Sequence, residues 1–375
     1  MSVALSSRAG WRVLLAAMLG ASSASCDDVL GLEELHVEGA SSGGSSADGS
    51  GGSTSSSVGG GATGGTGGTG GGACAGPAGP ELLRPILDPL AVAVGTDRVF
   101  WIERTVNIST LDSRDACVDD YRTEALTNRD PAPFLSASGE DACWVTSTPT
   151  SWQVQCGNNA NNGNDLDEYT QSQTTVGDVA LTANGVYWLE QPDDGAWSVQ
   201  YAARGALNAP VPVYEAGVNV TITAIAASAD VVAWLEYDRT TAYVVTAPAT
   251  GTSLQTEHRF ESSVPYKALA VFGKRVLYAN TTHVRELDLS GGGMPELDYQ
   301  AGSRVLQVAF DEAGDRFALA TDNAAGPWFV IQVQDDAGGP KVADTIVDPR
   351  GFAVNGDAVY YLQAKAGAGI YRQAR

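Results

Sequence analysis

Basic residues and long hydrophobic runs are scarce in this sequence. The 375 residues include 22 Lys and Arg against 44 Asp and Glu, which gives a formal charge of −22 at pH 7. Because a phosphate backbone is bound through a basic surface, this charge argues against a nucleic-acid partner. No apolar stretch reaches the roughly 18 residues that a membrane-spanning helix needs.

Residue patterns typical of catalysis are also missing. The sequence has no G-x-S-x-G elbow, no H-E-x-x-H pair and no phosphate-binding loop. Its three histidines are His36, His258 and His283, and none of them has a recurring acidic partner. The five cysteines show no Cys-x-x-Cys spacing, which argues against zinc and thiol-redox sites. We therefore expect no catalytic residues and no cofactor.

Residues 1–25 have the composition of an export signal. Arg8 and Arg12 precede a short apolar run at 13–21, and small residues follow before Cys26. This arrangement resembles a bacterial lipoprotein signal, which implies lipidation of Cys26, although Ser23 stands where Leu is typical. Ordinary signal cleavage at the same small residues is the alternative. Lipidation would leave an even number of cysteines, as suits an exported protein.

Residues 26–80 are predicted to be a disordered tether. The stretch 39–80 contains 18 Gly and nine Ser, including GGTGGTGGG at 64–72. Such a segment cannot bury a hydrophobic core. At about 5.5 Å × √n it would span roughly 35 Å, so we interpret it as a spacer.

Residues 81–375 contain an internal repeat. An apolar segment with an aromatic anchor recurs every 41 to 46 residues, seven times, with Leu replacing the aromatic in the sixth unit. The anchors are Trp101, Trp144, Trp188, Trp234, Tyr278, Leu319 and Tyr361. A small residue recurs eight positions before them: Ala93, Ser136, Ala180, Ala226, Ala270 and Ala353, with Ala309 equivalent in the sixth unit.

Each unit fits four short strands. In the third unit, 179–183 and 186–190 flank an Asn184-Gly185 turn, and 197–203 and 211–216 follow. Four-stranded units of this length predict an all-β fold, a seven-bladed β-propeller, in which small residues line the crowded axis. A pair of β-sandwiches would not keep so regular a spacing. The pattern resembles the bacterial extracytoplasmic propellers with YVTN-type and TolB-like repeats.

The last unit contains only three strands. We expect residues 81–87 to supply the fourth by pairing with 369–374, which would close the ring and cover an exposed edge. Strands of a blade alternate in direction, so the tether would then join the face opposite the ends of the second strands.

Two pairs of cysteines are expected to form disulfides. Cys143 and Cys156 flank a turn at 147–151 and should face each other across two strands; buried thiols are the alternative. Cys74 and Cys117 are then left to each other.

Calcium is the one metal that the sequence suggests. The Asn-rich loop 158–168 does not match an EF-hand, because Ala160 and Tyr169 would occupy ligand positions. A looser calcium site using Asp165, Asp167 and Glu168 stays open beside a plain solvated loop.

A polar column follows the anchors by two residues. Its members all offer oxygen: Glu103, Thr146, Glu190, Glu236, Asn280, Thr321 and Gln363. We expect these side chains to point into loops on one face, where three carboxylates could hold a cation or a cationic partner. The alternative is that strand ends are simply hydrated.

Two classes of function remain. The first is an extracytoplasmic binding or scaffold module, a monomer tethered by lipid to the outer membrane or surface of a Gram-negative bacterium, with a protein or glycan partner. Inner-membrane or periplasmic placement is not excluded. The second is a propeller enzyme, a lyase or lactonase with a metal on the axis. The inner strands are mostly Ala, Val and Leu, which favours the binding module.

Overall fold

The computed structural model describes residues 79–375 except 97, 106–107, 116–120, 128–129, 159–166, 173, 194, 250–255, 261–263, 292–294, 324–325 and 366. They belong to one compact unit that spans Gly70–Arg375. None of the described residues forms a helix that is long and apolar enough to cross a membrane.

The described strands form seven four-stranded sheets, which we number as blades 1 to 7 in chain order. Blade 1 consists of β2 (Pro89–Val94), β3 (Arg98–Thr105), β4 (Ile108–Asp115) and β5 (Tyr121–Thr127), and blade 2 of β6 (Asp130–Ser138), β7 (Asp141–Thr148), β8 (Ser151–Asn158) and β9 (Asp167–Ser172). Blade 3 consists of β10 (Thr174–Leu181), β11 (Gly185–Pro192), β12 (Ser198–Ala203) and β13 (Val211–Glu215). Blade 4 consists of β14 (Thr221–Ala227), β15 (Val231–Tyr237), β16 (Ala242–Pro248) and β17 (Thr256–Phe260). Blade 5 consists of β18 (Ala268–Phe272), β19 (Arg275–Ala279), β20 (His283–Asp288) and β21 (Pro295–Gln300). Blade 6 consists of β22 (Arg304–Phe310), β23 (Arg316–Thr321), β24 (Trp328–Val333) and β25 (Lys341–Ile346). Blade 7 consists of β26 (Pro349–Val354), β27 (Ala358–Gln363), β28 (Gly369–Ala374) and β1 (Glu81–Pro85).

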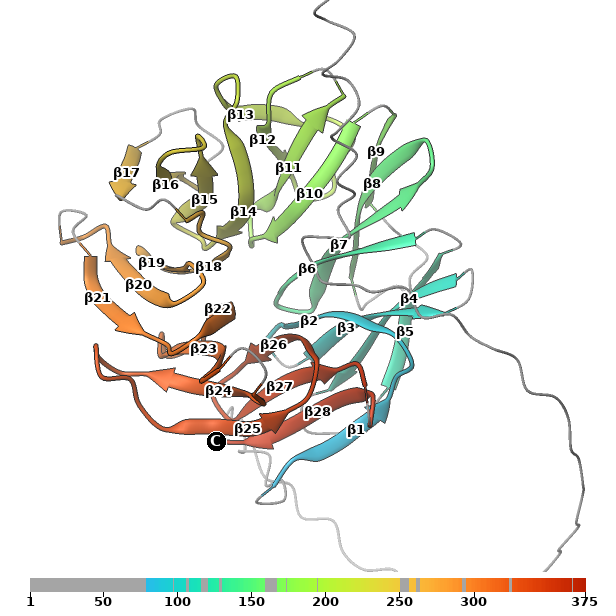
Figure 1. Ribbon diagram of the computed structural model, residues 1–375. Coiled ribbons are helices and arrows are strands. Elements are labelled where there is room, and N and C mark those ends of the chain that lie inside the picture. The colour runs from blue at the N-terminus through green and yellow to red at the C-terminus, as the bar shows by residue number, and fades with distance from the viewer. Residues whose placement is uncertain are drawn as a thin grey trace, which may run out of the picture. The chain divides into compact units, whose positions relative to one another are not determined.

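The blades are arranged in a closed ring around one axis (Figure 1). The first strand of each blade packs against the first strand of the next, and β26 packs against β2. The predicted all-β propeller with four-stranded blades is confirmed.

Blade 7 combines the two ends of the described chain. β1 pairs antiparallel with β28, from Glu81 opposite Arg372 to Pro85 opposite Gly369. Ile86, directly after β1, is 2% exposed and joins the core of this blade. The expected closing strand therefore forms, and it covers the edge that β28 would otherwise expose.

The repeat columns have the structural roles that their spacing predicts. In six blades the small residue pairs with the residue before the anchor, as in Ala180 with Tyr187; in the sixth, Ala309 pairs with Phe317, two residues before Leu319. All seven small residues line the axial cavity, where larger side chains from converging strands would collide. The anchors lie in the second strands and are buried between neighbouring blades, with Trp188 and Trp234 at 0% exposure.

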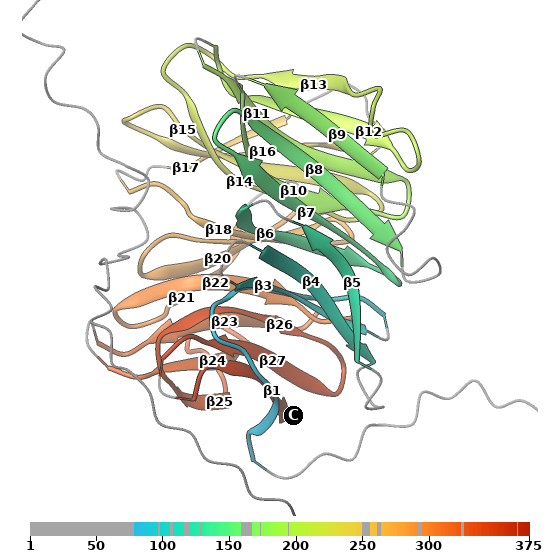
Figure 2. The same cartoon turned by 90° about the vertical axis from the view of Figure 1, so that its right-hand side faces the viewer.

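The ring has two faces. We call the face with the second-to-third and fourth-to-first loops of the blades the mouth face, and the other the opposite face (Figure 2). First strands start and second strands end at the mouth face. Because β1 is a fourth strand antiparallel to β28, the chain enters it from the opposite face.

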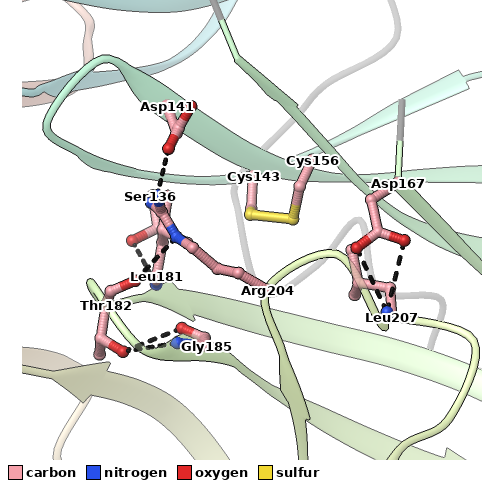
Figure 3. The surroundings of a disulfide bond; sticks show 10 residues. All are labelled: Ser136, Asp141, Cys143, Cys156, Asp167, Leu181, Thr182, Gly185, Arg204 and Leu207. Atoms are coloured by element: carbon pink, nitrogen blue, oxygen red, sulfur yellow. Dashed lines mark hydrogen bonds and ion pairs between the residues drawn. A yellow bond between two sulfur atoms is a disulfide. The ribbon is translucent and has the colours of Figure 1, made fainter. Parts of the chain in front are cut away.

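The opposite face has a disulfide within blade 2 and ionic contacts between blades. The predicted disulfide Cys143–Cys156 is present, and it links directly paired residues of β7 and β8 (Figure 3). Beside it, Arg204 of the β12–β13 loop pairs with Asp141 of β7. The carboxylate of Asp167 accepts hydrogen bonds from the backbone N–H of Leu207, at 3.2 and 3.3 Å.

A second ionic cluster joins blades 5 and 6. The Glu286 side chain is fully buried and pairs with Arg275 of its own blade and with Arg316 of the next. Arg375 pairs with Asp311 and, at 3.2 Å, with Asp315 in the β22–β23 turn. Buried charges are tolerated here because each has an opposite charge within contact distance.

Candidate functional site

The first strands are irregular where they reach the mouth face. Six of the seven carry a register shift within their first residues, and β18 alone pairs with its neighbour without one. In blades 1, 3, 4, 6 and 7 the shift inserts one extra residue, which in blades 4, 6 and 7 is Thr223, Leu306 and Arg350. Lys267 occupies the matching position just before β18. A bulge of this kind turns a side chain that would otherwise lie in the sheet towards the rim.

These extra residues surround a cavity on the axis. It has a volume of about 230 Å³, and its lining includes Thr223, Lys267, Leu306 and Arg350. A second cavity of about 330 Å³, lined by the small-residue column, shares several lining residues with it and continues along the axis. The lining of the mouth therefore combines apolar side chains with Thr223, Lys267 and Arg350, and the interior lining is mainly apolar.

Two cations flank Leu306 at the mouth. Lys267 is exposed, and within the described part of the chain its ammonium group has no ion-pair partner. The nearest carboxylate oxygen to Arg350 belongs to Asp348, 3.9 Å from Nη2, and Arg350 Nε is buried without a hydrogen-bond partner. A buried N–H without an acceptor costs about 1–3 kcal/mol. The mouth is thus suited to an anionic group that brings acceptor oxygens.

One carboxylate faces the same cavities. Asp178 accepts hydrogen bonds from the backbone N–H of Val179, at 2.9 Å, and of Ile225 in the next blade, at 3.2 Å. Burial raises the pKa of its carboxyl to about 6, although the two N–H donors act against the shift. One oxygen therefore links blades 3 and 4, the other caps its own strand, and both are used as hydrogen-bond acceptors.

Other inner-strand side chains make similar links between blades. Gln307 donates to the carbonyl of Phe352 and accepts from its N–H, both at 3.0 Å. Ser136 accepts from the N–H of Leu181 at 2.9 Å (Figure 3). Such bonds fix the spacing of the first strands, and hence the shape of the mouth.

The polar column predicted as a ligand face lies mostly inside the blades. Glu103, Thr146, Glu190, Glu236 and Thr321 are at most 9% exposed. The expectation that the column points into loops is therefore wrong for these five. They do end the second strands at the mouth face, but they belong to separate blades and are not brought together.

The buried glutamates have a local reason to be where they are. Residues two apart on a strand share a face, so a glutamate two positions after a tryptophan can accept from the indole N–H. Trp188 donates to Glu190 at 3.3 Å and Trp234 donates to Glu236 at 2.7 Å. Burial raises the pKa of Glu190. Burial is also the largest cause of the raised pKa of Glu103, which accepts from the N–H of Leu87.

The remaining column members stabilise turns or neighbouring strands. Asn280 accepts from the N–H groups of Thr282 and His283, at 2.9 and 2.8 Å, and Gln363 accepts from Val347 at 3.1 Å. Thr321 donates to the carbonyl of Asn323 at 2.8 Å, and Thr146 donates to Gln155 at 3.4 Å.

Several predicted residues lie outside the described part of the chain: Cys26, His36, Cys74, Cys117 and Asp165. Of the calcium candidates that are described, Asp167 accepts from Leu207, and Glu168 accepts from Gln155 Nε2 at 2.7 Å. His283 shares a 2.9 Å hydrogen bond with Thr282. Among the described residues, no group of three or more His, Cys, Asp or Glu is placed to hold a metal ion.

Backbone strain distinguishes the mouth face. Four described residues other than glycine have a left-handed φ, namely Asn219, Arg239, Thr345 and Asp348, with φ from 48 to 75°. All four lie in, or at the strand end of, loops on the mouth face. On the opposite face the same backbone region is filled by glycines 139, 205, 273, 314 and 338. Strain kept at side-chain-bearing positions is a recognised mark of functional sites.

The repeat alignment contains a signal for the mouth residues. Counting three positions back from the small-residue column gives Leu90, Pro133, Gly177, Thr223, Lys267, Leu306 and Arg350. Two cations at the start of strands that are otherwise apolar mark this column.

No protein-family model and no curated protein matches this sequence. Solved structures match by fold. A streptogramin B lyase structure superposes with a TM-score of 0.59 at 10% identity, covering 78% of this chain and 96% of that one. The WD40 repeats of RRP9 give 0.57 at 11%, covering 79% and 97%. YCF48 bound to D1 peptide gives 0.54 at 11%, covering 79% and 95%. At these identities the likeness establishes the β-propeller fold alone.

Proposed function

We propose that this protein is a binding or scaffold module whose mouth face holds a carboxylate-bearing segment of a partner protein. The observation that carries the proposal is the bulge column, which presents Lys267 and Arg350 on either side of Leu306 at the axial cavity. A carboxylate there would supply the acceptor that Arg350 Nε lacks. Leu306, which is 38% exposed, offers an apolar contact between the two charges.

The fold is compatible with such a partner. A bound peptide is part of the YCF48 structure, which has the same fold. The net charge of −22 would repel an acidic segment at long range, so binding requires the local pair of cations. This combination favours recognition of a particular segment over general attraction to acidic proteins.

The enzyme alternative has less support. A lyase or lactonase with an axial metal needs carboxylates or histidines that converge on the axis. In the described residues no such cluster exists, and Asp178 uses both oxygens to accept backbone hydrogen bonds.

The test is a comparison of binding by the wild type and by the double variant Lys267→Gln/Arg350→Gln. A peptide of six glutamates, and partners captured from a membrane extract, should bind the double variant at least tenfold more weakly. The melting temperature should stay unchanged, because neither cation is part of a buried ion pair. Glu103→Gln/Glu190→Gln/Glu236→Gln tests the earlier column. If that triple variant loses binding while the double variant keeps it, the axial mouth is not the site.

We also propose that the protein is exported in the manner of the YVTN-type and TolB-like propellers and anchored through lipid on Cys26. The support is the composition of residues 1–25 and the tether. Cys26→Ala should move the protein from the membrane fraction to the soluble fraction. Retention in the membrane after a carbonate wash would contradict the anchor.

A further inference from the structure

A third cavity, apart from the two on the axis, lies on the mouth face between blades 3 and 4. It has a volume of about 330 Å³, near the lower limit of small-molecule sites. Its lining includes Gln191, Trp197, Val218, Asn219 and Arg239, which come from the loops β11–β12, β13–β14 and β15–β16. Lys267 and Arg350 do not line it, so it is separate from the axial site.

The tryptophan wall of this cavity is fixed in place. A Cβ atom at Gly177 would lie 3.3 Å from Cζ3 of Trp197, so the indole ring occupies the space over this glycine in β10. The Trp197 carbonyl accepts a hydrogen bond from the N–H of Ala216 at 2.8 Å, which ties this loop to the next one. The Trp197 side chain is half-buried, and its exposed part lines the cavity.

Arg239, which also lines the cavity, lies in a turn whose shape is fixed by hydrogen bonds. Asp238 accepts hydrogen bonds from the N–H groups of Thr240 and Thr241, at 2.9 and 2.7 Å. Tyr237 donates to the carbonyl of Arg239 at 2.9 Å. Arg239 itself has φ 75°, a backbone conformation that glycine would adopt without strain. Its side chain is exposed, and no carboxylate among the described residues pairs with it.

We propose that this cavity binds a saccharide that carries a carboxylate, of the uronic-acid type. The indole ring of Trp197 offers an apolar surface for the C–H face of a sugar. The amides of Gln191 and Asn219 offer donors and acceptors for hydroxyl groups. The guanidinium of Arg239 matches a carboxylate with two parallel hydrogen bonds. Asn219, like Arg239, keeps its side chain at a left-handed φ, 72°.

The remaining features suit a sugar better than a peptide. A bound peptide needs partners for its backbone along its length, whereas this cavity is compact, at about 330 Å³. Val218 at the rim is 87% exposed and can contact the ring of a second sugar residue.

The experiment measures binding of digalacturonic acid and of its neutral counterpart, digalactose, to the full chain by calorimetry. The variants Arg239→Gly and Asn219→Gly remove a side chain and relieve backbone strain at once, so both should fold. Thr345→Gly is the matched control, because it makes the same backbone change on the same face outside the cavity. Arg239→Lys keeps the charge and loses the planar pair of donors.

The wild type should bind the acidic disaccharide at least tenfold more tightly than the neutral one. Arg239→Gly should lose at least tenfold in affinity, Arg239→Lys and Asn219→Gly severalfold, and Thr345→Gly and Lys267→Gln/Arg350→Gln nothing. Equal binding of both sugars, no binding at millimolar concentration, or an unaffected Arg239→Gly would overturn the proposal. So would a hexaglutamate peptide that binds with the same dependence on Arg239 while the sugar does not.

Discussion

The two faces of the propeller solve the same geometric problem with different residues. Both need turns with a left-handed backbone. Among the described residues, the opposite face uses only glycines, whereas the mouth face uses Asn219, Arg239, Thr345 and Asp348 as well as Gly302 and Gly367. Charges differ in the same way. Glu286, Arg204 and Arg375 are in ion pairs that join blades on the opposite face, whereas Lys267 and Arg239 pair with no described carboxylate.

The groups that stabilise the fold therefore gather on one face, and the groups that we propose to bind partners lie on the other. The opposite face has the disulfide, the buried ion pairs and relaxed turns, all of which favour the folded ring. The mouth face keeps strained turns and an unsatisfied buried N–H, which cost free energy. Substitutions on the opposite face should therefore destabilise, and many substitutions on the mouth face should not.

Removal of the closing strand should have the largest effect. Deleting residues 79–87 removes the strand that pairs with β28 and the buried Ile86. We expect the melting temperature to fall by roughly 10 °C or more, because the ring opens and an edge is exposed. A deletion of equal length at 50–58 is the control, and equal effects of the two deletions in a thermal melt would contradict the role of β1.

The second largest effect is expected from neutralising Glu286, the buried carboxylate of the opposite face. Glu286→Gln leaves Arg275 and Arg316 without their shared anion. The free energy of unfolding in urea should fall by about 3–5 kcal/mol. Asp298→Asn breaks an exposed pair with Arg285 and should cost less than about 1 kcal/mol. A smaller loss for Glu286→Gln than for this control would show that the buried cluster does not stabilise the fold.

Loss of the disulfide should destabilise the protein by about 3 kcal/mol, because the bond joins residues 13 apart and restricts the unfolded chain. The double variant Cys143→Ala/Cys156→Ala tests this in urea denaturation. Wild-type protein treated with a reductant should behave in the same way. If reduction changes the midpoint and the double variant does not, the effect belongs to another pair of cysteines.

The pH dependence of stability should reveal Asp178. Its folded pKa, about 6, is raised above the ordinary value of 3.8, so the folded state favours the protonated form. Its stabilising contribution is therefore present below pH 4 and is lost as the pH rises through 6. Relative to Asp178→Asn, the wild type should lose about 2–3 kcal/mol between pH 4 and 7. A constant difference between the two proteins would show that the carboxyl titrates normally.

The smallest effect is expected from a mouth-face turn. Thr345 is β-branched and has φ 60°, so Thr345→Gly relieves strain of about 1 kcal/mol, and part of this gain is offset by the freer unfolded chain. The melting temperature should rise slightly or stay the same. A clear loss of stability would remove the contrast between the faces.

The sequence predicted the fold through side chains whose position repeats. An anchor such as Trp188 must be buried between blades, and Ala180 must be small beside the axis, so both recur at the blade period. The turn at Asn184-Gly185 fixed the register of the first two strands of blade 3. Closure by β1 followed because the last unit lacked a strand.

The mouth could not be predicted in the same way, because it depends on bulges. Strict alternation assigns Arg350 to the sheet surface, and only the extra residue in β26 turns it towards the axis. The glutamates were misplaced for a different reason. Glu190 and Glu236 look like hydrated strand ends until the buried indole N–H groups of Trp188 and Trp234 are known to need an acceptor.

The pairing of β1 with β28 also has a consequence for the synthesis of the protein. Glu81 finds its partner in Arg372, about 290 residues further along the chain. Six blades can form from contiguous segments as the chain emerges, but the seventh waits until β28 has been made. A chain that is interrupted late in translation thus remains an open arc with bare edges at both ends. Such exposed surfaces are prone to aggregation, so only the complete chain gives the closed ring.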